Sequence, residues 1–473
     1  MEMKTKIRDG RKMDYRKAIL VSLPFFAITI FWQAYDTIMP QMLAYHFGLS
    51  SSVLGMIMGL DNLVALVFLP LFGVLSDRVH SRLGRRTPFI LWGTIGGAVC
   101  FVLMAVADNR QLAGLVAAGI PGKYAAATDA AAKAAVLGEI GQIQRANPGN
   151  FVLMLVALLF GVFLMSLFRS PATALSADTF IRPLRSKSNA VLNIMGGIAG
   201  VVFLVLNKKM ASLYGGFFTL ILCSSLMMLV GLALYMLFVR EPKLVKQVEE
   251  DNKRFGIETG DDGKRVDGKL RPDVRKSLFY ILAVVVFMYM GYNAFSTHFS
   301  VYAIKQLGMT PSGISGPLLI RVVSVLVFCI PSAMLSTRIG RKMTARIGLA
   351  IVCVTIASVY FLTPSTARLI GPIFAVFGFG FALVSVNMGP MVVELCSDAD
   401  VGRYMGYYYL ATTAAQIVTP AFAGVFIDKV GQRSLAVYSA LFALLGFAAT
   451  FFVKHGDSKP VGVNAADVLG GSD

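Results

Sequence analysis

The sequence predicts an all-α integral membrane protein with twelve transmembrane helices in two pseudo-symmetric halves of six. Three observations lead to this fold class. The chain of 473 residues is 56% hydrophobic and only 15% charged, which is too little charge to solvate the surface of a soluble protein of this length. Apolar runs of about twenty residues, long enough to cross the hydrocarbon as a helix, recur along it. Short motifs of the first half also return in the second half.

The apolar runs define the predicted spans and their orientation. Most of the 44 lysine and arginine residues fall in segments on the same side as the N-terminus, so this side is predicted to be cytoplasmic. The net charge of +18 is then explained by topology and by contact with anionic lipid of the bilayer, and no nucleic-acid partner is expected. We expect a multi-pass protein of the plasma (cell inner) membrane with cytoplasmic N- and C-termini. The predicted helices lie near residues 17–43, 53–75, 88–106, 150–177, 188–206, 215–239, 277–304, 312–335, 343–363, 367–394, 402–427 and 433–453.

A charged stretch divides the chain. Residues 240–276 mix acidic, basic and glycine residues and are predicted to form a cytoplasmic linker that is helical near its start. The linker separates an N-terminal half, 1–239, from a C-terminal half, 277–454, and a cytoplasmic tail occupies 455–473. A long outer loop, 107–149, contains the alanine-rich stretch KYAAATDAAAKAAVLGEIGQIQ, which predicts a helix outside the membrane.

Two short motifs occur at matching helix numbers in both halves. LSDR followed by GRR comes after the second predicted helix, and LSTR followed by GRK comes after the eighth. PATALSAD ends the fourth helix and PMVVELCSD ends the tenth, each with an arginine beyond it. Together these repeats indicate a duplicated six-helix unit. Two such halves around a midplane site are a physical basis for alternating access.

The hairpin after the second helix, GVLSDRVHSRLGRRTPFI, resembles that of the major facilitator superfamily, where it reads roughly G-x-x-x-D-R-x-G-R-R. The resemblance covers the whole chain and implies the major facilitator fold. It also implies a latch, in which the Asp stabilises a helix end in the opposite half and the arginines pair with acidic residues across the cytoplasmic gap. Such charge-assisted hydrogen bonds form in one conformation and break in the other. The alternative is that the arginines only enforce topology. With the repeated motifs included, the predicted latch residues are Gly73, Asp77, Arg78, Gly84, Arg85, Arg86, Asp178, Arg185, Arg338, Arg341, Asp398 and Arg403.

The longer spacing DRVHSRLGRRTPFI is similar to a branch of that superfamily, the sucrose/proton and glycoside–pentoside–hexuronide symporters. The end of the fourth helix, P-x-x-A-L-x-A-D, is similar too. This resemblance implies proton-coupled import of a sugar, with a disaccharide or glycoside expected. The chain departs from the branch in the fourth helix, where FGVFLMSLF lacks the acid of plant-type sucrose symporters. The paired acids of the melibiose-type sodium site are not matched either.

Charged residues inside predicted helices are expensive and normally face a cavity or a partner. A carboxylate paired with an arginine stays ionised, and its protonation would shift the balance between inward- and outward-facing states. Asp36 is the first choice of proton carrier, because the first helix of each half lines the cavity in this superfamily, and Asp61 is the second. The alternative for each acid is a static ion pair that fixes helix packing. The predicted proton-coupling residues are Asp36, Asp61, Arg169, Arg321 and Glu394.

Sugars are bound by hydrogen-bonding side chains together with aromatic faces that cover their C–H surfaces. The first helix supplies such a mixture in FWQAYDTIMP and the seventh in FMYMGYNAFSTHF, where His298 near the outer end is expected to be solvated. Any one of these residues could instead make a helix-packing hydrogen bond. The predicted substrate-binding residues are Trp32, Gln33, Tyr35, Asp36, Asn193, Tyr289, Tyr292, Asn293, Arg321 and Asn387.

No catalytic or metal site is expected. The sequence has no nucleophile–base constellation and no phosphate-binding loop, and its five cysteines are widely spaced in apolar segments. We therefore expect a secondary transporter, not an enzyme, which works as a monomer without a cofactor and uses the proton as coupling ion, with sodium as the alternative. Rival hypotheses are an exporter of amphipathic compounds, an ion-independent sugar uniporter, and a transporter-like sensor that signals through the linker.

Overall fold

A computed structural model describes residues 13–79, 81–181, 184–215, 217–255, 271–395 and 401–456. These residues are almost entirely helical, with one isolated bridge between Ser212 and Gly215 outside the helices. Within the described ranges, eleven helices are long and apolar enough to cross a membrane, and the bent pair at the N-terminus makes twelve spans if it counts as one. The predicted fold class is confirmed.

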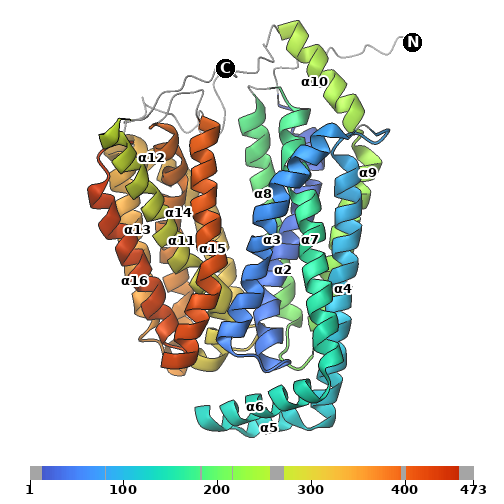
Figure 1. Ribbon diagram of the computed structural model, residues 1–473, viewed down its shortest axis with the longest axis vertical. Coiled ribbons are helices and arrows are strands. Elements are labelled where there is room, and N and C mark those ends of the chain that lie inside the picture. The colour runs from blue at the N-terminus through green and yellow to red at the C-terminus, as the bar shows by residue number, and fades with distance from the viewer. Residues whose placement is uncertain are drawn as a thin grey trace.

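Each half contributes six spans on either side of one linker helix, α10 (Glu241–Phe255). Figure 1 shows the two bundles standing side by side. The first half contains α1 (Tyr15–Val21), α2 (Leu23–Tyr45), α3 (Ser51–Arg78), α4 (Thr87–Ala117), α7 (Pro148–Thr179), α8 (Arg185–Met210) and α9 (Phe217–Phe238). The second contains α11 (Pro272–Leu307), α12 (Ser315–Ile339), α13 (Arg341–Val359), η2 (Pro364–Leu369), α14 (Ile370–Val393), α15 (Val401–Val430), α16 (Ser434–Ala449) and η4 (Thr450–Phe452).

Local sequence explains where several of these helices begin and end. The Asp14 side chain accepts from the Lys17 amide and caps α1, which is the usual role of an aspartate at this position. Proline occupies the first turn of α2, α4, α7 and α11, where its missing N–H would have had no partner in the helix. Gly308 ends α11 with a φ of 65°, a conformation that favours glycine. The first span bends by 45° at the break between α1 and α2.

Two helices lie outside the bundle between α4 and α7. They are α5 (Ile120–Ala126) and α6 (Ala130–Ala146), and Figure 1 places them at the end opposite to α10. Their own small core joins Leu115 and Ile120 to Val136 and Ile140. We call this end of the molecule the α6 side and the other end the α10 side.

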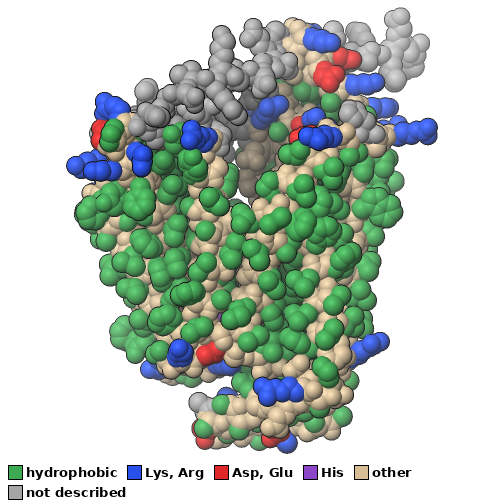
Figure 2. All heavy atoms as spheres, viewed as in Figure 1, with side chains coloured by type: hydrophobic (Ala, Val, Ile, Leu, Met, Phe, Trp, Pro, Cys, Tyr) green, Lys and Arg blue, Asp and Glu red, His purple; other side chains and the backbone are tan. Residues whose placement is uncertain are grey.

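The outer surface fits a bilayer. Figure 2 shows a broad band of hydrophobic side chains, with lysine and arginine gathered at its two rims and most densely on the α10 side. Large apolar side chains such as Trp92, Leu237 and Phe361 are 65%, 73% and 78% exposed. Their exposure would be unfavourable in water over so large an area but suits contact with lipid.

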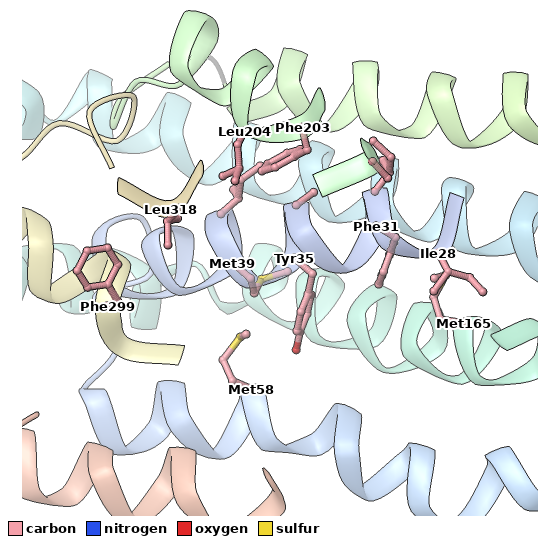
Figure 3. Packing of buried hydrophobic residues seen from close by; sticks show 14 of the residues in the cluster. Ile28, Phe31, Tyr35, Met39, Met58, Met165, Phe203, Leu204, Phe299 and Leu318 are labelled. Carbon is pink, nitrogen blue, oxygen red and sulfur yellow. The ribbon is translucent and has the colours of Figure 1, made fainter. Parts of the chain in front are cut away.

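Helix α2 occupies the centre of the first half. Its residues Phe31, Tyr35 and Met39 are buried, and they pack around Met58 of α3 and Met165 of α7 (Figure 3). This central position leaves one short stretch of α2, around Asp36, open toward the second half.

Candidate functional site

The two halves enclose a cavity of about 230 Å³. The first half contributes α2 and the second half contributes α11, α12 and α14. The lining residues are Gln33, Asp36 and Thr37 on α2, Tyr292, Ser296 and Ser300 on α11, Leu318, Arg321, Val322, Val325 and Leu326 on α12, and Phe377 and Phe381 on α14. The cavity therefore joins a carboxylate from one half to a guanidinium from the other.

The four charges predicted at mid-membrane are gathered around this cavity. Asp36 of α2 lies within electrostatic reach of Arg321 of α12 and Arg169 of α7. Asp61 of α3 lies within reach of Asp36 and Arg169. In the described part of the chain, none of the four forms an ion pair within 4 Å. Asp36 and Arg321 line the cavity itself, whereas the Asp61 carboxylate accepts from the Asn62 amide and side chain at 2.7 Å.

Aromatic rings hold the two arginines in place. The Arg169 guanidinium lies 5.8 Å from the ring centroid of Trp32, and that of Arg321 lies 5.7 Å from the ring of Tyr292. Both distances are within the range of a cation–π contact. The rings thus orient the cations without neutralising them.

One wall of the cavity is an aromatic stack. The Tyr292 ring lies 4.5 Å from that of Phe381 at an interplanar angle of 29°, and 6.4 Å from that of Phe377 at 11°. Facing groups are polar: Gln33 Nε2 donates to Thr37 Oγ1 at 3.2 Å. A flat apolar face opposite hydrogen-bonding groups and charges is the mixture that a sugar ring requires.

The cavity includes polar and aromatic residues that the sequence analysis missed. Thr37, Ser296 and Ser300 add hydroxyls, and Phe377 and Phe381 complete the stack. Helical spacing could have found some of them, because Ser296 and Ser300 follow Tyr292 at intervals of four residues on one helix face.

Several predicted binding residues lie elsewhere. Tyr35 is buried with its hydroxyl unpartnered, and Asn293 Nδ2 is also buried without a hydrogen bond. Asn193 is exposed and donates to the Asn189 carbonyl, whereas Asn387 is buried and donates to the Leu383 carbonyl. Tyr289 packs edge-on against Tyr292 at 6.4 Å. Of the predicted set, Gln33, Asp36, Tyr292 and Arg321 line the cavity.

The expectation for His298 is wrong. This side chain is 2% exposed, and its Nε2 lies 2.9 Å from the Pro420 carbonyl of α15. The histidine is therefore a packing contact between α11 and α15 and not a solvated end group.

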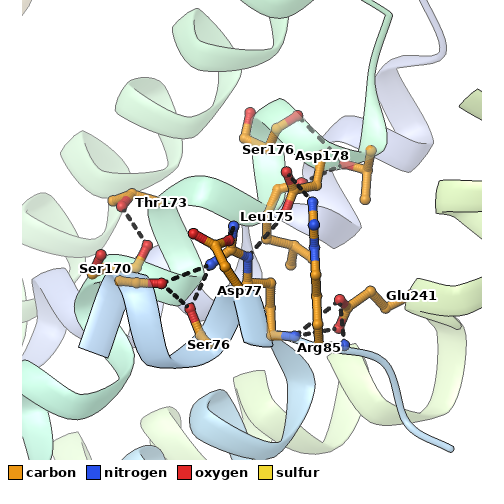
Figure 4. A network of polar contacts seen from close by, with 12 residues as sticks. Ser76, Asp77, Arg85, Ser170, Thr173, Leu175, Ser176, Asp178 and Glu241 are labelled. Carbon is orange, nitrogen blue, oxygen red and sulfur yellow. Dashed lines mark hydrogen bonds and ion pairs between the residues drawn. The ribbon is translucent and has the colours of Figure 1, made fainter. Parts of the chain in front are cut away.

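The hairpin after α3 forms a network of ion pairs on the α10 side (Figure 4). Arg85 pairs with Asp178 at 2.7 Å, and Arg86 pairs with Asp178 at 2.9 Å and with Asp77 at 2.5 Å. Arg86 also donates to Ser76 Oγ. These contacts lie within the first half, between α3, α4 and α7. The family resemblance implies partners in the opposite half. In this conformation, the ion pairs of Arg85 and Arg86 described above are instead made with Asp77 and Asp178 of the same half.

Glu241, the first residue of α10, was missed by the sequence analysis. Its carboxylate accepts from the amides of Arg85, Arg86 and Thr87 at 2.8–2.9 Å and from Thr87 Oγ1 at 2.7 Å. It therefore caps α4, although it lies 154 residues beyond Thr87, the first residue of that helix. Gly84 has a φ of 113°, and a Cβ there would lie 2.3 Å from the Glu241 carboxylate, so only glycine fits.

The second half repeats part of this arrangement. Arg341 forms an ion pair with Glu394, so Glu394 lies at the helix ends and away from the cavity. Gly340, with a φ of 89°, occupies the place that Gly84 has in the first half. Three of the remaining predicted latch residues make hydrogen bonds: the Gly73 carbonyl accepts from Arg86, Arg185 donates to the Phe180 carbonyl, and Arg403 donates to the Tyr407 hydroxyl. Arg78 and Arg338 are exposed. Asp398 lies outside the described residues.

Curated relatives match a short part of the chain. YagG, a candidate glycoside/cation symporter of Escherichia coli (strain K12), is 35% identical over 78 residues, which are 16% of this chain and 17% of YagG. Solute carrier family 45 member 3 of Mus musculus is 33% identical over 109 residues, which are 23% of this chain and 19% of the relative. The matches thus span less than a fifth of each relative.

Solved structures match the fold over nearly the whole chain. The xylose transporter XylE of E. coli, in an inward open conformation, superposes with a TM-score of 0.61 at 14% identity, covering 94% of this chain and 97% of that one. A bacterial homologue of the iron transporter ferroportin, in an inward-facing state, gives 0.63 at 13% identity and covers 93% and 99%.

The family model covers almost the entire chain. The model described as Major Facilitator Superfamily matches residues 21–387 and again residues 305–467. This match agrees with the two six-helix halves and the cavity between them. Family and fold make the protein a transporter and not an enzyme. The chain belongs to the Major Facilitator Superfamily.

Proposed function

We propose that this transporter moves a sugar across the plasma membrane by alternating access, in symport with protons. The observation that carries the proposal is the cavity between the halves, where the Asp36 carboxylate shares the lining with the Arg321 guanidinium and an aromatic stack. Sugar hydroxyls donate to a carboxylate and accept from a guanidinium, so one solute can bridge the two halves. Binding then favours a closed arrangement around the solute.

Coupling follows from the charges around Asp36. An ionised Asp36 is attracted to Arg321 of the opposite half and to Arg169 of its own. Protonation removes the attraction and leaves both arginines free to bind solute or to separate. The proton and the sugar therefore act on the same contact between halves, which is the requirement for coupling. Asp61, which reaches Asp36 and Arg169, is the second carrier in this scheme.

The chemistry of the cavity supports a sugar. Its hydroxyl and amide groups and the Tyr292–Phe381 stack suit a pyranose ring. The matches to a candidate glycoside/cation symporter and to a solute carrier family 45 member point the same way. The volume of about 230 Å³ is below the roughly 300–1,000 Å³ of pockets for drug-sized ligands, so a test panel needs single-ring sugars beside disaccharides and glycosides.

An exporter of amphipathic compounds is the second candidate. It is favoured by the apolar part of the cavity, made by Leu318, Val322, Val325 and Leu326. The charged and polar residues of the same cavity favour the sugar, because an apolar solute would leave them desolvated without partners.

Orientation and location complete the proposal. The α10 side, which carries the denser lysine and arginine rim, faces the cytoplasm by the positive-inside rule. The protein then lies in the plasma membrane with both ends of the chain in the cytoplasm, and one chain forms the complete monomeric transporter. Sodium replaces the proton as coupling ion if imposed sodium gradients drive uptake.

The test measures solute-induced proton movement in proteoliposomes with sucrose, maltose, related glycosides and single-ring sugars. Asp36→Asn is compared with Asp129→Asn, which alters the N-cap residue of α6, outside the cavity. We expect alkalinisation of the medium with one sugar, and its loss in Asp36→Asn while sugar counterflow continues. Counterflow without a proton or sodium signal would show a uniporter. Silence with every sugar would refute the sugar assignment and favour the exporter, and silence with amphipathic compounds as well would favour the sensor.

A further inference from the structure

Helix α3 of the first half begins against the end of α15 of the second half. The Asp428 carboxylate of α15 accepts from the Ser51 amide at 2.8 Å through Oδ1, and from the Ser52 amide at 2.8 Å and the Ser52 hydroxyl at 2.6 Å through Oδ2. The Val53 amide donates to Oγ of Ser50, the N-cap residue of α3, at the long distance of 3.4 Å. The first free amides of α3 are therefore satisfied by a residue from the other half of the molecule.

The two helix backbones touch beside this contact. A Cβ added at Gly55 would lie 2.0 Å from the Pro420 carbonyl oxygen, and one added at Gly424 would lie 2.2 Å from the Ser51 carbonyl oxygen. Further along α3, a Cβ at Gly59 would lie 2.9 Å from the carbonyl oxygen of Ile417. No side chain fits between α3 and α15 over this stretch, so the halves are in direct contact on the α6 side.

A second cross-half contact lies on the same side. Asn207 of α8 donates to Ser315 Oγ of α12 at 2.7 Å and to the Pro311 carbonyl at 3.2 Å. Toward the α10 side, the helices of the two halves diverge (Figure 1). The structure thus has its closed end on the α6 side, and the Asp428 carboxylate is part of that closure.

We propose that Asp428 is a latch that holds the α6 side closed by capping α3 of the opposite half. A carboxylate at a helix N-terminus is favoured by the free amides and by the helix dipole. When the halves separate on the α6 side, Asp428 loses three hydrogen bonds, and the Ser51 and Ser52 amides of α3 lose their acceptor. Asp428 therefore biases the equilibrium toward the conformation with the α6 side closed, and solute binding or protonation must offset this bias in each cycle.

Other charged groups near Asp428 do not replace the cap. Lys305 of α11 lies within electrostatic reach and belongs to the same half, so it moves together with Asp428. His298, also on α11, is occupied by the Pro420 carbonyl. Of the contacts that Asp428 makes, the bonds to Ser51 and Ser52 cross from one half to the other.

The test measures the distance between the halves on the α6 side by pulsed electron resonance. Spin labels replace Gln142 of α6 and Arg368 of η2, which are exposed on this side in the first and second half, in a background without the five native cysteines. Asp428→Asn and Asp428→Ala are compared with Asp129→Asn. Asp129 also caps a helix on the α6 side, through the Ala132 amide at 2.6 Å, but only within its own half.

We expect a longer-distance population in both Asp428 variants, with the ratio of open to closed molecules rising by about 2- to 30-fold, the range for loss of a helix N-cap. Asp129→Asn keeps the distances of the parent protein. Ser52→Ala, which removes only the hydroxyl bond, gives a smaller shift and covers the case in which the Asp428 variants do not fold. Unchanged distances in folded Asp428 variants, or in folded Ser52→Ala if they do not fold, would overturn the proposal. No solute or ion gradient is needed, so failure of the sugar or proton assignment leaves this measurement intact.

Discussion

His46 follows α2 on the α6 side, and both of its ring nitrogens face acceptors. Nδ1 lies 2.6 Å from the Asp108 carboxylate of α4, and Nε2 lies 2.5 Å from the Leu213 carbonyl in the turn before α9. Two acceptors require two donors, so the ring is bound as the imidazolium. The ring also stacks on Tyr214 at 6.1 Å, and it ties the ends of three segments together.

Replacing His46 with glutamine removes the charge from this site. The histidine side chain is fully buried and that of Asp108 is 2% exposed, so the carboxylate would be left without its counter-charge in the interior. Breaking a buried pair by removing one partner costs about 3–5 kcal/mol, of which the lost charge-assisted hydrogen bonds form a part. We therefore expect His46→Gln to lower the free energy of unfolding by about 3–5 kcal/mol near neutral pH and below.

The same geometry gives a pH dependence. Burial disfavours the charged ring, but the Asp108 carboxylate and the Leu213 carbonyl outweigh it and raise the pKa of His46 above its ordinary value of 6.5. Because folding raises this pKa, the stabilisation is complete below about pH 6.5 and is lost as the pH rises through the raised value. The melting temperature of the detergent-solubilised protein is then expected to fall as the pH rises through this window. The His46→Gln variant lacks the titrating ring and is expected to lack this part of the fall.

Controls separate this effect from general damage. His455→Gln alters a histidine whose side chain is 35% exposed, and little change is expected. Adding Asp108→Asn to His46→Gln removes the buried charge and is expected to recover part of the lost stability. Two results would refute this explanation. One is a His46→Gln variant that melts at the same temperature as the parent protein at about pH 6. The other is a melting temperature of His46→Gln that falls with rising pH as much as that of the parent protein.

Three further outcomes follow from other contacts. Glu241→Ala leaves the first amides of α4 without an acceptor and is expected to cost about 1–2 kcal/mol in thermal unfolding, whereas Glu250→Ala, on the exposed face of α10, changes little. Gly84→Ala forces a side chain into a φ of 113° against Glu241 and is expected to cost about 1–3 kcal/mol, whereas Gly114→Ala, with open space around it, is harmless; equal effects would contradict the argument. Tyr292→Leu removes the aromatic face of the cavity and is expected to raise KM for the sugar about 2- to 10-fold in uptake assays, and an unchanged KM would move the sugar elsewhere.

Much of the architecture could be predicted from the sequence. Span length and the positions of lysine and arginine are local properties, and they suffice to place helices such as α3 and α15 within a few residues of the observed ends. The charges at mid-membrane could also be predicted to gather, because a charge in hydrocarbon is stable only beside a cavity or a partner. Asp36, Asp61, Arg169 and Arg321 satisfy this rule together.

The choice among polar residues could not be predicted in the same way. In a bilayer, both the lipid-facing and the interior faces of a helix are apolar, so hydropathy does not show which face points inward. Asn193 and Asn387 look equivalent to Gln33 in the sequence, yet they donate to backbone carbonyls of their own helices outside the cavity, whereas Gln33 lines the cavity beside Thr37. Which amide serves a solute depends on helix rotation, which neighbouring helices set.

The sequence by itself determined that this is a membrane transporter of two related halves with charges at its centre. The tertiary structure decided that Glu241 caps α4, that Asp428 caps α3 from the other half, and that α2, α11, α12 and α14 share the cavity. The physical reason is range. Insertion into lipid depends on each segment alone, whereas a hydrogen bond depends on two groups that only folding brings within 3 Å of each other.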